Sequence, residues 1–426
     1  MRSIKKSSEA ASLTVTVDYL GGLGDGVANT GSGRLHIPFT APGDEARVVA
    51  SGKESGKLIE LLNAGPDRIS PACIHFGSCG GCSLQHLAPS FIAEWKRMRI
   101  AAALARAGLG HVVVDALIAV PPCARRRATL AAERFGNRVT LGFTERASHA
   151  LVDLTECGVL RPELVAILPA LRDSLRTLLN NGEAADIGLT LTETGIDLAL
   201  IRSRPLTLPD REALASLAEH LDLARIAWRA GANKEAEPVA VRHTPSVRLG
   251  THSVILPVGG FLQPSVEGQT HLTKLVLDGL AGCTGSVVDI FSGLGTFAFP
   301  ASVAGPVVAF DSDGEAIAAL QVAAKRDRAA VTGHRRDLFR EPLTAKELGG
   351  FGAAIIDPPR AGASAQSKML AASSIPVIAA VSCSPVSFAR DAAILAEGGY
   401  MLEKVTPVDQ FPWSPHVELM GVFRRA

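Results

Sequence analysis

The 426-residue sequence has almost no charge imbalance and no apolar run long enough to cross a membrane. Lys and Arg number 43 and Asp and Glu number 42, so the formal net charge is +1. A protein that bound nucleic acid through unspecific charge alone would be more basic, so an RNA or DNA partner has to be met by local basic patches. The N-terminal MRSIKKSSEAAS is basic but is followed by no apolar segment, unlike a secretory signal. We therefore expect a cytoplasmic protein with no membrane partner.

Cysteine is scarce but unevenly distributed. Three of the seven cysteines lie within ten residues of the glycine-rich stretch PACIHFGSCGGCSLQH, with the spacing C-x5-C-x2-C. In a reducing compartment, clustered cysteines favour metal binding or catalysis over disulfides. A fourth thiolate is available far along the chain in TECGVLRP, and four thiolates suit an iron–sulfur cluster or zinc. The candidate metal ligands are Cys73, Cys79, Cys82 and Cys157, with His75 or His86 as a further ligand if the metal is zinc. Cys123 and Cys283 are assigned no role.

Three parts of the chain differ in pattern, which predicts a multidomain protein. Residues 12–63 alternate short strand patterns with turns, typical of a small β-barrel; GLGDGVA and PFTAPGDEARV resemble the TRAM domain, an RNA-binding OB-fold. Residues 64–245 hold the cysteine loop, a helical segment and strand-like pieces, which predicts a central α+β domain. Residues 246–426 alternate short apolar runs with helices, which predicts a doubly wound, Rossmann-like α/β domain that binds ligands beyond the carboxyl ends of its strands.

The first loop of the third part, DIFSGLGTF, combines an acid at a strand end with a G-x-G turn. Glycines at such a turn let the backbone approach a ligand, and an acid at the end of the next strand can accept hydrogen bonds from ribose hydroxyls. Asp313 is an alternative ribose ligand or a helix cap. The third glycine of a dinucleotide site is missing, which favours a smaller adenosine ligand. The order of loops resembles class I S-adenosylmethionine (AdoMet) methyltransferases, and the candidate cofactor contacts here are Asp289, Phe291, Gly293, Gly295, Asp311 and Asp337.

Two further motifs follow the next apolar runs. Asp357-Pro358-Pro359-Arg360 comes directly after GAAII, and its two prolines make a rigid platform at the strand end. We count Asp357 among the cofactor contacts. Cys383 lies in the polar turn SCSP after PVIAAV, one strand away. Lone cysteines are more often buried apolar residues, but at this edge a thiolate is a candidate nucleophile.

Taken together, DIFSGLGTF, DPPRAG, VSCSP and DQFPWSPHVELM resemble the 5-methyluridine RNA methyltransferase family. The resemblance covers nearly the whole chain, including the cysteine loop. It implies that Cys383 attacks carbon 6 of uracil, that Glu418 removes the proton from carbon 5, and that Gln263 in GGFLQPS helps to hold AdoMet. It also selects a [4Fe–4S] cluster held by Cys73, Cys79, Cys82 and Cys157, with zinc as the alternative.

The sequence departs from the family pattern at two positions that we expect to face RNA. Ser265 replaces the usual asparagine, and CARRR, ending in Arg125 to Arg127, replaces the commoner Tyr-Arg-Asn-Arg. The arginine run and the helical residues Lys96, Arg97 and Arg99 are candidate RNA-binding patches, or else simply solvated surface.

These observations predict a monomeric, AdoMet-dependent enzyme that makes 5-methyluridine in structured RNA. The TRAM-like domain together with the cluster loop favours 23S ribosomal RNA. The alternatives are a tRNA 5-methyluridine methyltransferase and an inactive, metal-stabilised RNA-binding protein. The presence of Cys383, Glu418 and Asp357 argues against inactivity.

Overall fold

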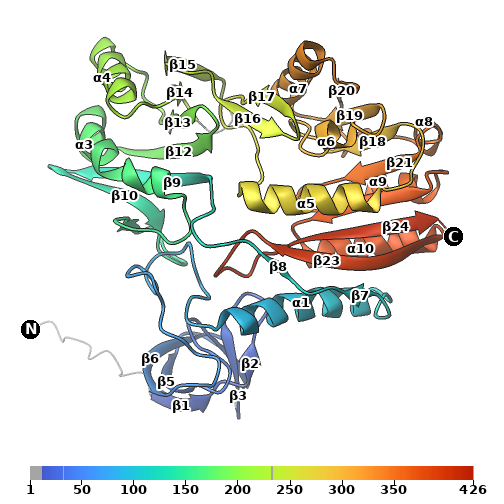
Figure 1. Cartoon of the computed structure of the whole chain (residues 1–426). Helices are drawn as coiled ribbons and strands as arrows, with labels where there is room; N and C mark the ends of the chain where they lie inside the picture. The colour runs from blue at the N-terminus through green and yellow to red at the C-terminus, as the bar shows by residue number, and fades with distance from the viewer. Residues whose placement is uncertain (1–11, 32, 232–233, 426) are drawn as a thin grey trace, which may run out of the picture. The chain divides into compact units, whose positions relative to one another are not determined.

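The computed structural model describes residues 12–31, 33–231 and 234–425 (Figure 1). The chain forms two compact units, residues 1–96 with 413–415 and residues 97–412 with 416–426. The division falls inside helix α1 (Pro89–Arg106) and differs from the three ranges expected from the sequence, whose assignment as domains stays a prediction. Among the described residues, no helix is long and apolar enough to span a bilayer.

The first unit is built from short antiparallel strands, as its alternating pattern predicts. One sheet has the order β1 (Ser12–Thr16), β5 (Glu45–Ala50), β6 (Gly56–Asn63), and a second has the order β2 (Tyr19–Leu20), β3 (Gly26–Thr30), β4 (Gly33–Ile37). Their inward side chains form a small core of Ala28, Leu35, Ile37, Ala46 and Val48. The OB-fold and the TRAM-like role of this unit remain predictions.

Within the first unit, the buried carboxylate of Asp44 binds the segment that follows β6. Asp44 accepts hydrogen bonds from the backbone N–H of Ala41 at 2.6 Å and of Gly65 at 2.9 Å, and from the Arg68 guanidinium. Burial alone raises the pKa of a carboxyl, but Arg68 and these N–H groups outweigh it, and the pKa of Asp44 is lowered. The ionised Asp44 therefore anchors the start of the loop that carries the cysteines.

The second unit contains two large sheets. The first has the order β11 (Leu151–Asp153), β10 (Arg138–Thr144), β9 (Arg127–Phe135), β12 (Ala184–Thr192), β13 (Gly195–Ile201), β14 (Arg225–Arg229), β15 (Ala236–Val241). Helices α2 (Pro162–Ala166), α3 (Leu168–Leu178) and α4 (Leu208–His220) accompany this sheet (Figure 1). Leu171, Leu175 and Leu178 of α3 and Leu214 and Leu217 of α4 pack into its core.

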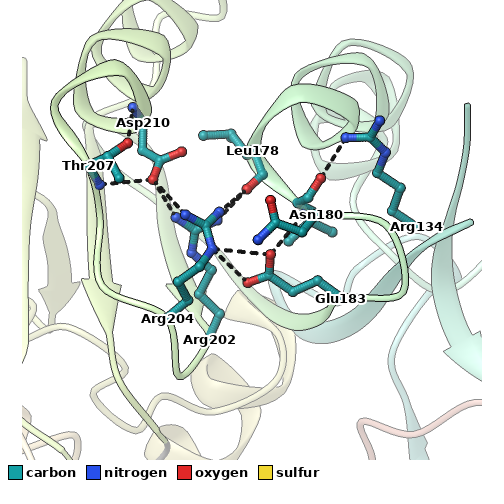
Figure 2. A network of polar contacts seen from close by, with 9 residues as sticks. Arg134, Leu178, Asn180, Glu183, Arg202, Arg204, Thr207 and Asp210 are labelled. Carbon is teal, nitrogen blue, oxygen red and sulfur yellow. Dashed lines mark hydrogen bonds and ion pairs between the residues drawn. The ribbon is translucent and has the colours of Figure 1, made fainter. Parts of the chain in front are cut away.

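Arginines close the carboxyl end of α3 (Figure 2). The last carbonyls of a helix have no partner within it. Arg202 and Arg204 both donate to the carbonyl of Leu178, and Arg134 donates to the carbonyl of Leu179 at 2.7 Å. Asp210, in the capping box at the start of α4, pairs with Arg202 at 2.8 Å. These contacts join β9, β13, α3 and α4, so we assign these charged side chains a structural role.

The second sheet confirms the doubly wound α/β prediction. Its order is β20 (Val331–Arg335), β19 (Val307–Asp311), β18 (Val287–Ile290), β21 (Ala353–Ile356), β22 (Val377–Ser382), β24 (Glu418–Arg425), β23 (Tyr400–Asp409), β7 (Val113–Val114), with β8 (Ile118–Ala119) also paired to β23 (Figure 1). Strands β20 to β22 are parallel, and β24 runs antiparallel to both neighbours. The short hairpin β16 (Ser246–Leu249) and β17 (His252–Ile255) precedes this sheet in the chain.

Helices cover both faces of this sheet. Successive side chains of a strand point to opposite faces, and the strands here are apolar on both faces, so both have to be buried. Ile355 and Ala379 pack in one core with α5 (Val266–Gly279), α6 (Ala298–Ala301) and α7 (Gly314–Asp327). Ala354 and Ile378 pack in the other core with α8 (Ala345–Leu348), α9 (Ser364–Ala371), α10 (Pro385–Glu397) and the C-terminal half of α1. With both faces covered, a ligand can reach this sheet only at its edges and strand ends.

Candidate active site

The sequence-predicted acids gather at the carboxyl ends of neighbouring strands. Asp289 lies in β18, Asp311 ends β19 and Asp357 directly follows β21. Cys383 directly follows β22, and Glu418 is the first residue of β24. Leu419 pairs with Ser382, so the antiparallel register places Glu418 beside Cys383. The parallel and antiparallel parts of the sheet thus bring the predicted cofactor and catalytic residues to one edge.

The G-x-G loop adopts a conformation that its glycines permit. Phe291, Gly293 and Gly295 all have positive φ, of 66°, 53° and 89°. A Cβ on Gly295 would also lie 2.9 Å from the Phe299 ring, so this position needs glycine for space as well as for conformation. Asp311 accepts the Gly293 N–H at 2.8 Å, which fixes the loop against β19. The glycines of the motif therefore leave the loop backbone without side chains beside the strand ends, where a ligand can approach it.

Asp289 is buried with neither carboxylate oxygen in a hydrogen bond among the described residues. Its pKa is raised well above the usual range by burial first, and then by the negative charges of Asp357 and Asp311; the nearby backbone N–H of Ala298 offsets only part of this. Buried carboxylates without a partner are costly unless a cation meets them. The site therefore fits a positively charged cofactor, as the sulfonium and ammonium of AdoMet would be.

The two candidate ribose contacts, Asp311 and Asp313, and the candidate cofactor contact Asp337 have distinct local roles. Asp311 accepts the Asp313 N–H at 2.8 Å in addition to that of Gly293, and each oxygen retains capacity for a ligand hydroxyl. Asp313 caps α7 by accepting from Glu315 and Ala316, which is the helix-cap alternative for this residue. Asp337 accepts the N–H of Phe339 at 3.1 Å, and Phe339 packs on Phe291 with ring centroids 5.4 Å apart.

Gln263 and Asp357, which come from distant parts of the chain, are in direct contact. Gln263 is buried and its Nε2 donates to Oδ2 of Asp357 at 3.3 Å. Burial, and secondly the charge of Asp311, raises the pKa of Asp357 to about 7. Gln410, which sequence reasoning missed, donates from Nε2 to Oε1 of Gln263 at 2.8 Å. The sequence signal for Gln410 is its place in DQFPWSPHVELM, a motif in which we singled out only Glu418.

Cys383 is half-buried and Glu418 is buried. Burial first, and then Glu418 and Asp357, raises the pKa of the Cys383 thiol to about 11, while Arg360 opposes this. Burial and Asp357 raise the pKa of Glu418 to about 8. The SCSP turn has a local reason: Ser384 caps α10 by accepting from Ser387, and a proline suits the first turn of a helix. Without a cation, both groups are therefore mainly neutral at pH 7.

Arg126 and Ser265 are buried and do not face solvent, which corrects the expectation that both positions face RNA, whereas Arg125 and Arg127 are half-buried. Arg126 is buried, and burial first lowers its pKa to about 10. It donates to the Gln263 carbonyl at 3.0 Å and to Oε1 of Gln269 at 2.7 Å. Ser265 is 1% exposed and caps α5 by accepting from Gly268.

The remaining members of the basic patches also differ from a simple solvated surface. Arg127 donates to the Leu262 carbonyl at 3.0 Å and lies over the Phe261 ring. Lys96 is fully buried, so it cannot line an exposed RNA-binding helix face. Charged side chains in these segments therefore make internal contacts, and Arg126 and Arg127 support the loop that carries Gln263.

The four predicted cluster cysteines are divided between the two units, with Cys157 in the second. No disulfide links the described cysteines, and no group of three or more His, Cys, Asp or Glu side chains within the described ranges is arranged to hold a metal ion. His86, a ligand in the zinc alternative, uses Nε2 to bond the Thr40 carbonyl at 3.1 Å. The [4Fe–4S] cluster therefore stays a prediction from the sequence.

Comparison with known proteins places the chain among RNA methyltransferases. No protein-family model matches it. An uncharacterized RNA methyltransferase of Brucella suis is 40% identical over 413 residues, which cover 96% of this chain and 97% of the relative. The 23S rRNA (uracil(1939)-C(5))-methyltransferase of Edwardsiella ictaluri is 29% identical, with 97% and 96% covered.

A solved structure shares the fold of nearly the whole chain. It is the tRNA (uracil-54, C5)-methyltransferase of Pyrococcus abyssi in complex with S-adenosyl-L-homocysteine, with a TM-score of 0.76, 24% identity, and coverage of 98% of this chain and 100% of that one. The multidomain methyltransferase fold expected from the family resemblance is thereby confirmed. With the identity to its bacterial relatives, the chain belongs to the RNA methyltransferase family that its motifs indicated.

Proposed function

We propose that this enzyme transfers a methyl group from AdoMet to carbon 5 of a uridine in RNA. The observation that carries the proposal is the placement of Cys383 and Glu418 side by side, next to the acidic strand ends. A nucleophile beside a carboxylate is what carbon-5 methylation of uracil requires, because carbon 5 alone is a weak nucleophile. The names of the ribosomal and transfer RNA relatives, which both specify uracil carbon 5, support the same chemistry.

The reaction then divides between two side chains of this chain. The Cys383 thiolate adds to carbon 6 of uracil and directs the negative charge to carbon 5. Asp289, Asp311 and Gln263 would hold AdoMet, which would supply the methyl group to carbon 5 and leave as S-adenosyl-L-homocysteine. Glu418 removes the remaining proton from carbon 5, and the bond between sulfur and carbon 6 breaks, which restores the aromatic ring and the free thiolate.

The acidic pocket couples this chemistry to cofactor binding. In the cofactor-free protein, Cys383 and Glu418 carry raised pKa values because of burial and neighbouring negative charge. A cation bound among Asp289, Asp311 and Asp357 lowers the pKa of each nearby acid. Cofactor binding therefore favours the thiolate and the carboxylate that the two steps need.

For the RNA target, we propose 23S ribosomal RNA, with tRNA as the alternative. The ribosomal relative aligns with 97% of this chain, which is similar to the 98% covered by the tRNA methyltransferase structure. The preference for ribosomal RNA rests on the family resemblance, in which a TRAM-like domain together with a cluster loop is typical of the ribosomal branch. The first unit is proposed to bind RNA as a TRAM-like OB-fold. A [4Fe–4S] cluster on Cys73, Cys79, Cys82 and Cys157 is proposed from the sequence spacing and the family resemblance.

The experiment that tests the function supplies pure protein with methyl-labelled AdoMet and either total ribosomal RNA or total tRNA. We expect label in 5-methyluridine released by nuclease digestion of 23S RNA. Label in tRNA alone would replace the ribosomal target and retain the chemistry. No labelled 5-methyluridine in either RNA would contradict the proposed function and favour an RNA-binding protein without activity.

A further inference from the structure

A hydrogen-bonded chain of buried side chains runs from the start of α5 to the acidic pocket. The Ser265 hydroxyl donates to Oε1 of Gln410 at 3.2 Å. Gln410 Nε2 donates to Oε1 of Gln263 at 2.8 Å, and Gln263 Nε2 donates to Asp357 at 3.3 Å. Gln410 is 1% exposed and Gln263 3% exposed, so water does not compete for these bonds.

The direction of every bond in this chain follows from two backbone groups. A backbone N–H can only donate. The Ser265 N–H lies 3.4 Å from one end of the Gln410 amide, so that end is the oxygen. The Gly268 N–H donates to the Ser265 hydroxyl at 3.0 Å, which leaves the hydroxyl proton for the same oxygen. The NH2 group of Gln410 must then face an oxygen of Gln263, which turns the Gln263 NH2 toward Asp357.

Helix α5 leaves a recess for Gln410. A Cβ on Gly268 would lie 2.2 Å from Oε1 of Gln410 and 2.3 Å from its Cδ and Cγ, distances at which something must shift. On the other side, the turn that carries Gln410 is fixed because Asp409 accepts the Phe411 N–H at 3.0 Å. The side chain of Gln410 is therefore seated by shape as well as by hydrogen bonds.

We propose that Gln410 is a positioning residue that holds the Gln263 amide with its NH2 group toward the Asp357 carboxylate, and so favours the ionised, cofactor-binding form of that carboxylate. This inference rests on the proposed function. Without Gln410, the Gln263 amide can turn and present its oxygen to Asp357. An oxygen facing an oxygen disfavours the ionised carboxylate, whereas an N–H donor favours it.

Among the described residues, the groups that shift the pKa of Asp357 include no basic side chain. The titratable groups that act on it, or on which it acts, come from four strand ends and are acidic: Asp289, Asp311, Cys383 and Glu418. The charged residue of its own loop, Arg360, acts on Cys383. The amide of Gln263 donates a hydrogen bond to this carboxylate, and its orientation shifts the protonation equilibrium of Asp357 in addition to the effects of burial and of Asp311.

The test measures AdoMet affinity by calorimetry as a function of pH in the full-length protein. A cationic cofactor binds the ionised Asp357 more tightly, so affinity falls as pH drops through the pKa of Asp357. For Gln410→Met, we expect the midpoint of this fall to move up by about one pH unit and the affinity near neutral pH to drop roughly fivefold. The matched control is Gln366→Met, because Gln366 is an equally buried glutamine that bonds only Leu343.

A second variant covers the case in which Gln410→Met does not fold. Gly268→Ala fills the recess, expels the Gln410 side chain and improves helix propensity, so it should move the midpoint in the same direction. A wild-type midpoint in a folded Gln410→Met or Gly268→Ala protein would overturn the inference while leaving the proposed function intact. Failure of the wild-type protein to bind AdoMet would overturn both.

Discussion

Glu418 lies beside Cys383, because the residue after Glu418 pairs with the residue before Cys383 across β24 and β22. Glu418 starts β24 and Cys383 follows the parallel strand β22. The two residues meet because β24 pairs with β22 in the antiparallel direction. Both groups carry raised pKa values in the absence of a cation. The same juxtaposition therefore supplies a nucleophile and a base and makes both depend on the charge of a bound cofactor.

The buried carboxyl of Glu418 predicts that the cofactor-free protein loses stability as pH rises. The native pKa of about 8 lies above the usual value of 4.5, so between these values the native state holds a proton that the unfolded state has lost. The free energy of unfolding must then fall with increasing pH across this window. Glu418→Gln mimics the protonated form, so it should melt at a higher temperature than wild type at pH 8. Equal melting temperatures for the two proteins at pH 8 and at pH 5 would count against a buried, protonated Glu418.

We expect substitutions at Asp311 and at Asp313 to have different effects, the first on cofactor binding and the second on helix capping. Asp311→Asn should weaken AdoMet binding, because the residue both shapes the G-x-G loop and keeps acceptor capacity for ribose. Asp313→Ala removes the cap of α7 and should cost about 1 kcal/mol of stability with AdoMet affinity retained. Calorimetric titration and thermal melts of both variants check this. The reverse pattern would move the ribose contact to Asp313.

Arg126 is expected to act through the fold rather than through RNA. Arg126→Met leaves the Gln263 carbonyl and Gln269 without their donor and should cost about 1–3 kcal/mol of unfolding free energy. The dependence of RNA affinity on salt should keep its slope, since loss of a phosphate contact would reduce that slope by about one. Arg138→Met, whose side chain is 76% exposed, is the control for stability. A stable Arg126→Met protein with a reduced salt slope would restore the RNA-facing reading.

The metal prediction is tested on protein purified without oxygen. We expect a brown protein with iron and acid-labile sulfide in equal amounts, and Cys157→Ser should lose both because a ligand is missing. Cys283→Ser is the matched control, since Cys283 is assigned no role. Colourless, active protein with stoichiometric zinc would favour the zinc alternative.

The sequence predicted which residues lie at the strand ends better than it predicted the contacts between residues distant in the chain. The apolar runs that became β18, β19, β21 and β22 are local signals, and with them the positions of Asp289, Asp311 and Cys383 followed. Arg126 was misread because a run of arginines usually marks surface, and only the fold shows which one is enclosed. Strands β7 and β8 pair with β23 nearly 300 residues away, and two-residue strands leave no periodicity to detect. Gln410 was missed for the same reason, as its partner lies 147 residues away.

The most direct test of the account is a covalent trap. Glu418→Gln should still add Cys383 to uracil and accept the methyl group, but without the base the sulfur cannot leave. Incubation with RNA and methyl-labelled AdoMet should then give a labelled protein–RNA complex that survives denaturing gel electrophoresis and is absent from the Cys383→Ala, Glu418→Gln double variant. Cys383→Ala alone should be inactive. Methylation of RNA by Cys383→Ala at the wild-type rate would contradict the account.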